Sequence, residues 1–166
     1  MALTSEYMVC FVKEGKSTMN HSLMYQGSRL QLVNQLVYFD DEKLNFLNQY
    51  FPEPNQKRRN VENTISVYCS TLERIIKDLT EENLNSMALI GSQVDLRYLD
   101  DGSTESLTIV FPHRTDPNKN LISFLSPIGF QLLMAQTNEN YQLVIPSGET
   151  LVRVENIKFV NHGDVH

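Results

Sequence analysis

The first half of the chain has a helical pattern of apolar residues that is interrupted once. Between residues 22 and 84 prolines occur only at Pro52 and Pro54. Each proline removes an amide donor and crowds the preceding helical turn, so two so close together end a helix. The pattern predicts a hairpin of two helices over residues 22–84, with its tip near residues 52–56. Residues 1–21 form an N-terminal arm to which the sequence assigns no structure.

The two predicted helices carry matching rows of apolar residues. In the second helix the row alternates spacings of four and three: Val61, Ile65, Tyr68, Leu72, Ile75 and Leu79. The first helix offers Leu30, Val33, Val37, Leu44, Leu47 and Phe51. One antiparallel register satisfies both rows, which predicts a coiled-coil hairpin.

The same register places Asp40 opposite Tyr68. A carboxylate in an apolar row costs stability unless it is hydrogen-bonded, so the Tyr68 hydroxyl is the expected partner, and the pair would fix the register. Helices of roughly 30 residues give a rod of about 40–45 Å. A small domain cannot bury a rod of that length, so its far end is expected to reach solvent or a partner.

The second half of the chain changes to the alternation of strands. Two alternating runs flank a predicted turn at Asp101-Gly102, and a third strand is expected before the helix. Ser126-Pro127 is typical of a helix start, with the helix reaching about Gln136. Residues 141–145 and 151–160 form a closing hairpin. The prediction is an α+β fold whose antiparallel sheet carries one helix, over residues 88–160, followed by a frayed tail at 161–166 that contains His162 and His166.

The composition and the residue spacings argue against several classes of function. The net charge is −6 and the pI about 5.2, which argues against a protein that grips nucleic-acid phosphates by itself. The sequence has no zinc-ligand spacing, phosphate-binding glycine loop or nucleophile–base pair, so no cofactor, metal or catalytic residue is expected. His113, Arg114 and Asp116 are expected to be loop residues, and Cys10 and Cys69 buried thiols. The apolar run at residues 7–12 is too short to span a membrane, and no membrane partner is expected.

Several motifs together resemble a known family. They are Ile90-Gly91-Ser92-Gln93-Val94, the run from Leu121 to Gly129 containing Ser126-Pro127-Ile128-Gly129, Leu132-Leu133, and Ile145-Pro146-Ser147-Gly148-Glu149. This part of the chain, from about residue 89 to 160, is similar to the C-terminal domain of the Gre transcript-cleavage factors. The segment from Val110 to Arg114 also resembles a sister group, the regulator of nucleoside diphosphate kinase.

The resemblance implies an FKBP-like domain that docks on RNA polymerase beside its secondary channel, with an N-terminal coiled coil inserted there. The implied docking residues are Ser126, Pro127, Ile128 and Gly129. It also implies a cytoplasmic transcription regulator rather than an enzyme. An FKBP-type isomerase needs an aromatic pocket that commonly has a tryptophan at its floor, and this chain has no tryptophan. No independent, specific DNA binding is expected.

The predicted tip departs from that family. Cleavage-stimulating members carry a pair of acids at the tip, which can complete the coordination of a loosely held catalytic metal. Here the tip is Pro52, Glu53, Pro54, Asn55, Gln56, Lys57, Arg58 and Arg59. One carboxylate beside three cations predicts no cleavage stimulation; the cations form either a solvated helix start or a contact with nucleic acid or the catalytic centre. Two alternatives stay open: an adaptor of the nucleoside diphosphate kinase regulator type, and a true cleavage factor.

Overall fold

The structure is a computed structural model that describes residues 16–166, with side chains described from Tyr25 onward. Most of the predicted arm at residues 1–21 lies outside this range, as does Cys10. Residues 16–21 already belong to the first helix, which therefore begins earlier than the predicted residue 22.

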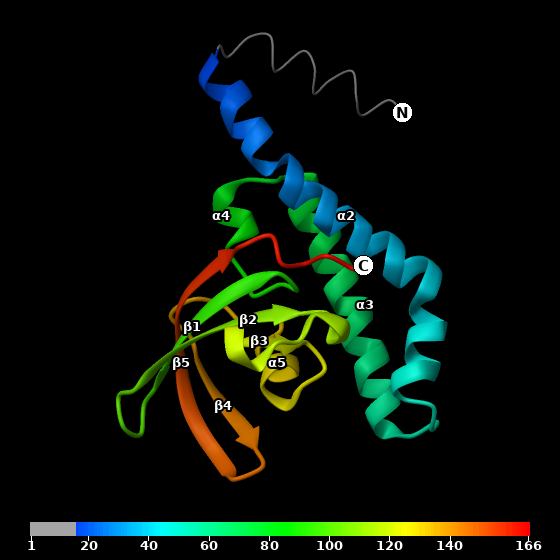
Figure 1. Cartoon of the computed structure of the whole chain (residues 1–166), viewed down its shortest axis with the longest axis vertical. Coiled ribbons are helices and arrows are strands. Elements are labelled where there is room, and N and C mark those ends of the chain that lie inside the picture. Colours follow the sequence, from blue (N-terminus) through cyan, green and yellow to red (C-terminus); the bar gives the residue numbers. More distant parts are fainter. Residues whose placement is uncertain (1–15) are drawn as a thin grey trace.

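Two long helices form the N-terminal hairpin (Figure 1). α2 spans Lys16–Tyr50 and α3 spans Gln56–Lys77, and the short α4 at Glu81–Leu84 follows. The Asn55 side chain caps α3 by accepting a hydrogen bond from the Arg58 amide at 3.0 Å. The chain between Tyr50 and Gln56 thus reverses direction at the two prolines, where neither helix can continue.

A five-stranded sheet forms the second layer. Its strands are β1 (Ser92–Tyr98), β2 (Thr104–Val110), β3 (Leu121–Ser123), β4 (Asn140–Ile145) and β5 (Gly148–Phe159), in the order β3-β2-β1-β5-β4. Two short 3₁₀ turns, η1 (Pro112–Arg114) and η2 (Pro117–Lys119), precede β3, and the helix α5 spans Pro127–Leu132. The predicted α+β class is confirmed.

Two details of the predicted domain are wrong. The sheet is mixed, because β2 and β3 run parallel, whereas all the other strand pairs are antiparallel. The helix α5 ends at Leu132 instead of continuing to about Gln136. Met134 adopts a left-handed φ of 65° and its amide donates to the Ala88 carbonyl at 2.7 Å, so the chain leaves the helix to bond the segment before β1.

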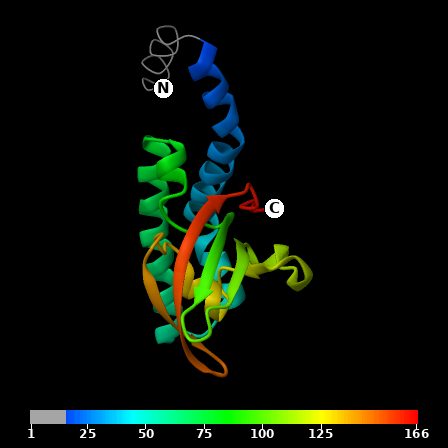
Figure 2. The ribbon, with the colours of Figure 1, turned by 90° about the vertical axis from the view of Figure 1, so that its left-hand side faces the viewer.

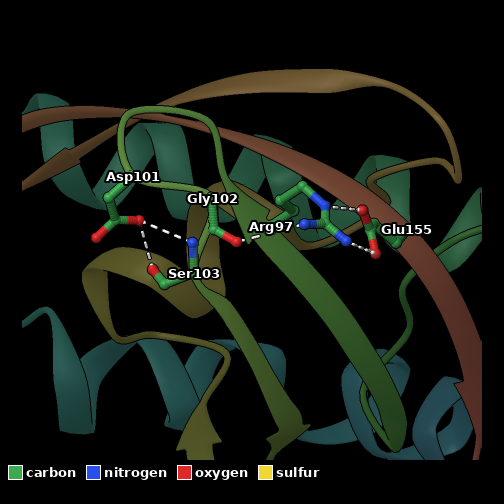
Figure 3. A network of polar contacts seen from close by, with 5 residues as sticks. All are labelled: Arg97, Asp101, Gly102, Ser103 and Glu155. Atoms are coloured by element: carbon green, nitrogen blue, oxygen red, sulfur yellow. Dashed lines mark hydrogen bonds and ion pairs between the residues drawn. The ribbon is translucent and has the colours of Figure 1, made fainter.

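The turn between β1 and β2 follows the sequence signal at Asp101-Gly102. Gly102 has a φ of 75°, which favours glycine, and the Asp101 carboxylate accepts hydrogen bonds from the amide and hydroxyl of Ser103 (Figure 3). Beside the turn, Arg97 donates to Glu155 on β5 (Figure 3). Both side chains are exposed, so this ion pair adds little stability.

The hairpin packs along the domain and is not a free rod. One hydrophobic core joins α2 and α3 to the sheet and α5, and Figures 1 and 2 show both helices lying together against the domain. Aromatic rings form much of this junction: Phe39 stacks on Phe111 with centroids 5.8 Å apart, and Phe46 stacks on Phe124 at 5.7 Å. The far end of the hairpin reaches solvent as expected, since Pro52, Glu53 and Pro54 are exposed, but α2 packs on the domain along its middle.

This packing changes which face of α2 is buried. The buried residues of α2 are Ser28, Leu32, Gln35, Phe39, Phe46 and Leu47. Of the predicted row, Leu30, Val37 and Leu44 are exposed instead. The heptad argument treated α3 as the only partner of α2. The domain is a second partner, and its aromatic rings favour the face that carries Phe39 and Phe46. The predicted row on α3 is buried from Val61 to Ile75.

The predicted hydrogen bond between Asp40 and Tyr68 is also wrong. Asp40 is exposed, whereas Tyr68 is fully buried and its hydroxyl donates to Gln35 Oε1 at 2.6 Å. The same hydroxyl accepts from the Ile90 amide at 2.9 Å, and Gln35 Nε2 donates to the carbonyls of Ile90 and Gly163 at 2.8 and 2.9 Å. Burial raises the pKa of Tyr68. The buried polar contact therefore joins both helices to the domain, not only to each other.

The C-terminal tail is ordered on α2, contrary to the expectation that it frays. Ser28 donates to the side chain of Asn161 at 2.8 Å, and Gln31 both donates to the Asn161 carbonyl and accepts from the Gly163 amide. A Cβ at Gly163 would lie 2.5 Å from both Gln35 Nε2 and the Ile90 carbonyl oxygen. Only glycine fits at this crossing, so the tail is part of the interface between hairpin and domain.

Replacing Tyr68 with phenylalanine tests the buried contact. The substitution Tyr68→Phe leaves the Ile90 amide and Gln35 Oε1 without their partner, so it should lower the free energy of unfolding by about 1–3 kcal/mol. Urea denaturation measures the change. The control Asp40→Asn should stay within about 0.5 kcal/mol, as is usual at an exposed site. An equal loss in both variants would contradict the assignment.

Candidate functional site

The hairpin tip is exposed but internally braced. Pro52, Glu53, Pro54 and Asn55 are all exposed. Arg58, the one partly buried member of the cationic run, donates to the Phe51 carbonyl at 2.7 Å and to Asn48 Oδ1 at 2.9 Å. These bonds cross from α3 back to the end of α2, so Arg58 holds the loop closed and is committed to the fold.

The other two cations remain at the surface. Lys57 Nζ lies 5.6 Å from the centroid of the Phe51 ring, within cation–π range. Arg59 donates to Gln56 Oε1 from the same helical turn. Both residues are exposed, so their charges face solvent beside Glu53. The tip as a whole presents one exposed carboxylate and two exposed cations.

The acidic residues of α2 do not supplement Glu53. Asp40, Asp41 and Glu42 are exposed, and Asp40 lies more than ten residues before the tip, a distance of about 15 Å or more along the helix. Among the residues that the structure describes, no group of three or more His, Cys, Asp or Glu side chains could hold a metal ion.

The second candidate surface is the start of α5. Ser126 caps the helix, since its hydroxyl accepts from the Gly129 amide at 3.1 Å and donates to the Ser123 carbonyl at 2.7 Å. A Cβ on Gly129 would lie 2.1 Å from the Ser123 carbonyl oxygen, so only glycine permits this close approach. Ser126 and Gly129 thus build the helix start and are not themselves a free binding surface.

The residues between them differ in exposure. Pro127 is exposed, and Ile128 is partly buried against the hydrophobic core. Behind them, Gln131 bonds both the amide and the carbonyl of Val144 on β4, each at 2.8 Å, which fixes α5 against that edge strand. Pro127 and Ile128 therefore form a small apolar surface at a helix start that hydrogen bonds hold in place.

The remaining candidate residues have structural surroundings. His113 is exposed on η1, and partial burial with the nearby charge of Arg114 lowers its pKa. Asp116 caps η2 and pairs with Lys119 at 3.3 Å. Cys69 is only half-buried on α3, not fully buried as expected, and burial raises the pKa of its thiol. None of these residues lies in a reactive constellation.

Sequence reasoning missed the residues that couple the two parts of the molecule. Gln35 and the aromatic pair Phe39 and Phe46 face the domain, but they stand outside the heptad row on which the sequence argument depended. Phe39 and Phe46 lie seven residues apart on one helical face, and this spacing was the signal in the sequence that could have identified them.

No helix in the described part of the chain is long and apolar enough to cross a membrane.

Comparison with known proteins identifies relatives of the domain that carries α5. The family described as "Transcription elongation factor, GreA/GreB, C-term" matches residues 84–159. The chain is 31% identical over 105 residues to transcription elongation factor GreA of Thermosipho africanus, covering 62% of this chain and 67% of that protein. With GreA of Desulfovibrio desulfuricans it is 35% identical over 71 residues, covering 43% and 44%. The chain spans about half the length of most of these curated relatives.

Solved structures of the same group are more distant. The GreA/GreB factor from Nitrosomonas europaea superimposes with a TM-score of 0.48 at 20% identity, covering 71% of this chain and 91% of that one. GreA factor homolog 1 of Thermus thermophilus gives a TM-score of 0.40 at 21% identity, covering 84% and 90%.

Proposed function

Because the chain belongs to the Gre family of transcription elongation factors, we propose that it binds RNA polymerase and regulates transcription without stimulating transcript cleavage. In this proposal the protein is not itself an enzyme. The α5 surface docks on the polymerase in the cytoplasm, and the hairpin tip faces the secondary channel. The observation that carries the proposal is the chemistry of the tip: one exposed carboxylate with exposed cations beside it.

The docking part of the proposal is supported by the α5 surface. The family match covers this whole region, and the motif Ser126-Pro127-Ile128-Gly129 forms a rigid helix start that leaves Pro127 exposed. A surface that is already ordered loses little conformational entropy on binding, which favours its use as a docking site.

The absence of cleavage stimulation is supported by electrostatics. A divalent metal ion requires several oxygen ligands, usually with negative charge. Glu53 offers a single carboxylate. Each nearby cation opposes a metal ion by roughly a kcal/mol or more at an effective dielectric constant near 20. Lys57 and Arg59 are held close to the loop by Phe51 and Gln56, so they cannot be moved away without losing these contacts.

The reach of the tip supports the same conclusion. The hairpin contacts the domain as far as Phe46, whose ring stacks on Phe124. From Phe46 to its end at Tyr50 the helix α2 advances only about 6 Å. A hairpin packed along its own domain presents a short tip to a partner, and a short tip with one acid occupies an opening without assembling a metal site.

A single surface substitution tests docking. The variant Pro127→Glu places a charge on the proposed contact, and an unpaired charge buried at an interface costs several kcal/mol. Binding to core RNA polymerase, measured without DNA, should weaken by about tenfold or more, since each 1.4 kcal/mol is tenfold. An acidic residue near a helix N-terminus is tolerated, so the fold should persist.

The matched control is Pro117→Glu, which changes an exposed proline at the start of η2. It should bind like the unmodified chain. If folded Pro127→Glu binds undiminished, the docking site lies elsewhere. If the unmodified chain does not bind core polymerase at all, the proposal fails and the adaptor alternative of the nucleoside diphosphate kinase regulator type is favoured.

A cleavage assay on backtracked complexes tests the tip. Alone, the chain should leave the transcript intact, because Glu53 cannot complete a metal site. Added with a GreA-type cleavage factor, it should slow cleavage in proportion to its concentration, because both would occupy the same opening. Transcript lengths on a denaturing gel report both results.

The variant Glu53→Gln serves as the control, since it removes the carboxylate and keeps the shape. Robust cleavage by the unmodified chain that Glu53→Gln abolishes would show a true cleavage factor with one sufficient acid. Binding to polymerase with neither cleavage nor competition would contradict occupancy of the channel.

A further inference from the structure

The sheet ends in two edge strands, β3 on one side and β4 on the other. An edge strand presents backbone amides and carbonyls that can pair with a strand of another molecule. β3 has only three residues, and the amide and the carbonyl of Leu121 both bond the backbone of Asp116 at 3.0 Å. The β3 edge is therefore short and is covered by the backbone of the chain itself.

The β4 edge is longer, and its own sequence does not protect it. Proteins commonly protect an edge strand with a charged residue or a proline. The six residues Asn140–Ile145 include neither. Val144 is 57% exposed, so an apolar side chain also lies open on this strand. By its sequence alone, β4 is suited to pair with a further strand.

The side chain of Gln131 on α5 covers the outward backbone groups of Val144. Gln131 Oε1 accepts a hydrogen bond from the Val144 amide, and Gln131 Nε2 donates to the Val144 carbonyl, both at 2.8 Å. Residues that lie opposite each other in an antiparallel ladder exchange the same pair of bonds. Gln131 Nε2 also donates to the Pro127 carbonyl at 2.7 Å. The carboxamide thus takes the place of a neighbouring strand and is held there by its own helix.

We propose that Gln131 caps the β4 edge and prevents it from pairing with the β4 edge of a second copy of the chain. Both backbone groups of Val144 are already bonded, so a second strand gains no hydrogen bond there unless it displaces Gln131. Removal of the carboxamide leaves an open donor and acceptor, which require new partners wherever they are buried. The second copy offers the same uncharged edge, so no repulsion between the two β4 strands opposes their pairing.

This inference does not rest on the proposed function. It concerns the β4 edge, and self-association is measured on the purified chain without polymerase. Pro127 and Ile128, the proposed docking residues, stay unchanged in every variant used here. Polymerase binding therefore remains a separate measurement, and the two proposals can fail separately.

Sedimentation equilibrium tests whether Gln131 prevents association. Gln131→Leu should strengthen self-association by at least about tenfold, as expected when the two hydrogen bonds at Val144 become available to a second copy. Gln131→Ala removes the same bonds without adding an apolar group, and it should associate as well. The matched control Gln142→Leu places leucine at an exposed site of β4 whose side chain bonds Glu149. It should behave like the unmodified chain.

A proline at the edge shows whether association uses the backbone of β4. The Val144 amide bonds Gln131 outside the sheet, so Val144→Pro removes this donor and keeps the ladder between β4 and β5. Combined with Gln131→Leu, it should restore the behaviour of the unmodified chain. Association that persists in the folded double variant, or equal association by Gln142→Leu, would overturn the proposal.

Hydrogen exchange supplies a readout that does not depend on association. The Val144 amide should be protected in the unmodified chain, although β4 is the last strand of the sheet. In dilute Gln131→Leu it should exchange at least about tenfold faster, because the opening of this bond no longer costs free energy. Protection should return as the variant is concentrated. Rapid exchange of the Val144 amide in the unmodified chain, or folded Gln131 variants that stay unassociated at every concentration, would overturn the proposal.

Discussion

The buried hydroxyl of Tyr68 is the interaction on which the arrangement of this protein depends. It connects α3 to Gln35 of α2 and to the amide of Ile90, which leads into the sheet. Gln35 in turn bonds the carbonyls of Ile90 and Gly163. Each of these groups is buried, and an unpaired polar group in such a site costs more than a hydrogen bond contributes. The hairpin, the domain and the tail can therefore separate only if all these bonds break together.

This constraint explains the position of both candidate functional surfaces. The network and the aromatic cluster around Phe39 hold the hairpin against the domain, so the tip stands only a short distance beyond Phe46. They also turn the heptad row of α2 outward, where Leu30, Val37 and Leu44 are exposed. The domain thus packs against the face of α2 that carries the aromatic rings and leaves the aliphatic face exposed.

The sequence predicts what depends on local rules. The helix break at the two prolines, the turn at Gly102 and the cap at Ser126 each follow from the preference of one or two residues for a backbone conformation. The row on α3 was also predictable, because its apolar spacing is regular. The family resemblance added the residues around Pro127 as a candidate surface.

The sequence does not predict which face of α2 is buried, because that depends on a partner distant in the sequence. Two apolar faces compete on this helix, and the rings of Phe111 and Phe124 decide between them. The polar centre was missed for a related reason. In the sequence pattern Gln35 has the position of an ordinary surface residue. It is buried because the carbonyls of Ile90 and Gly163, which are distant in the sequence, lie beside it and accept its hydrogen bonds. The position of the C-terminal tail depends on the same contact between Gly163 and α2.

Native-state hydrogen exchange, followed amide by amide, tests most directly whether hairpin and domain form one unit. Such exchange reports the free energy of opening at each site. The amide of Ile90, the amides of the buried face of α3 and those of β1 should all exchange with one common free energy, equal to that of global unfolding in urea. Exchange of the α3 amides at a free energy several kcal/mol lower, with β1 still protected, would show that the hairpin opens independently and would contradict the account.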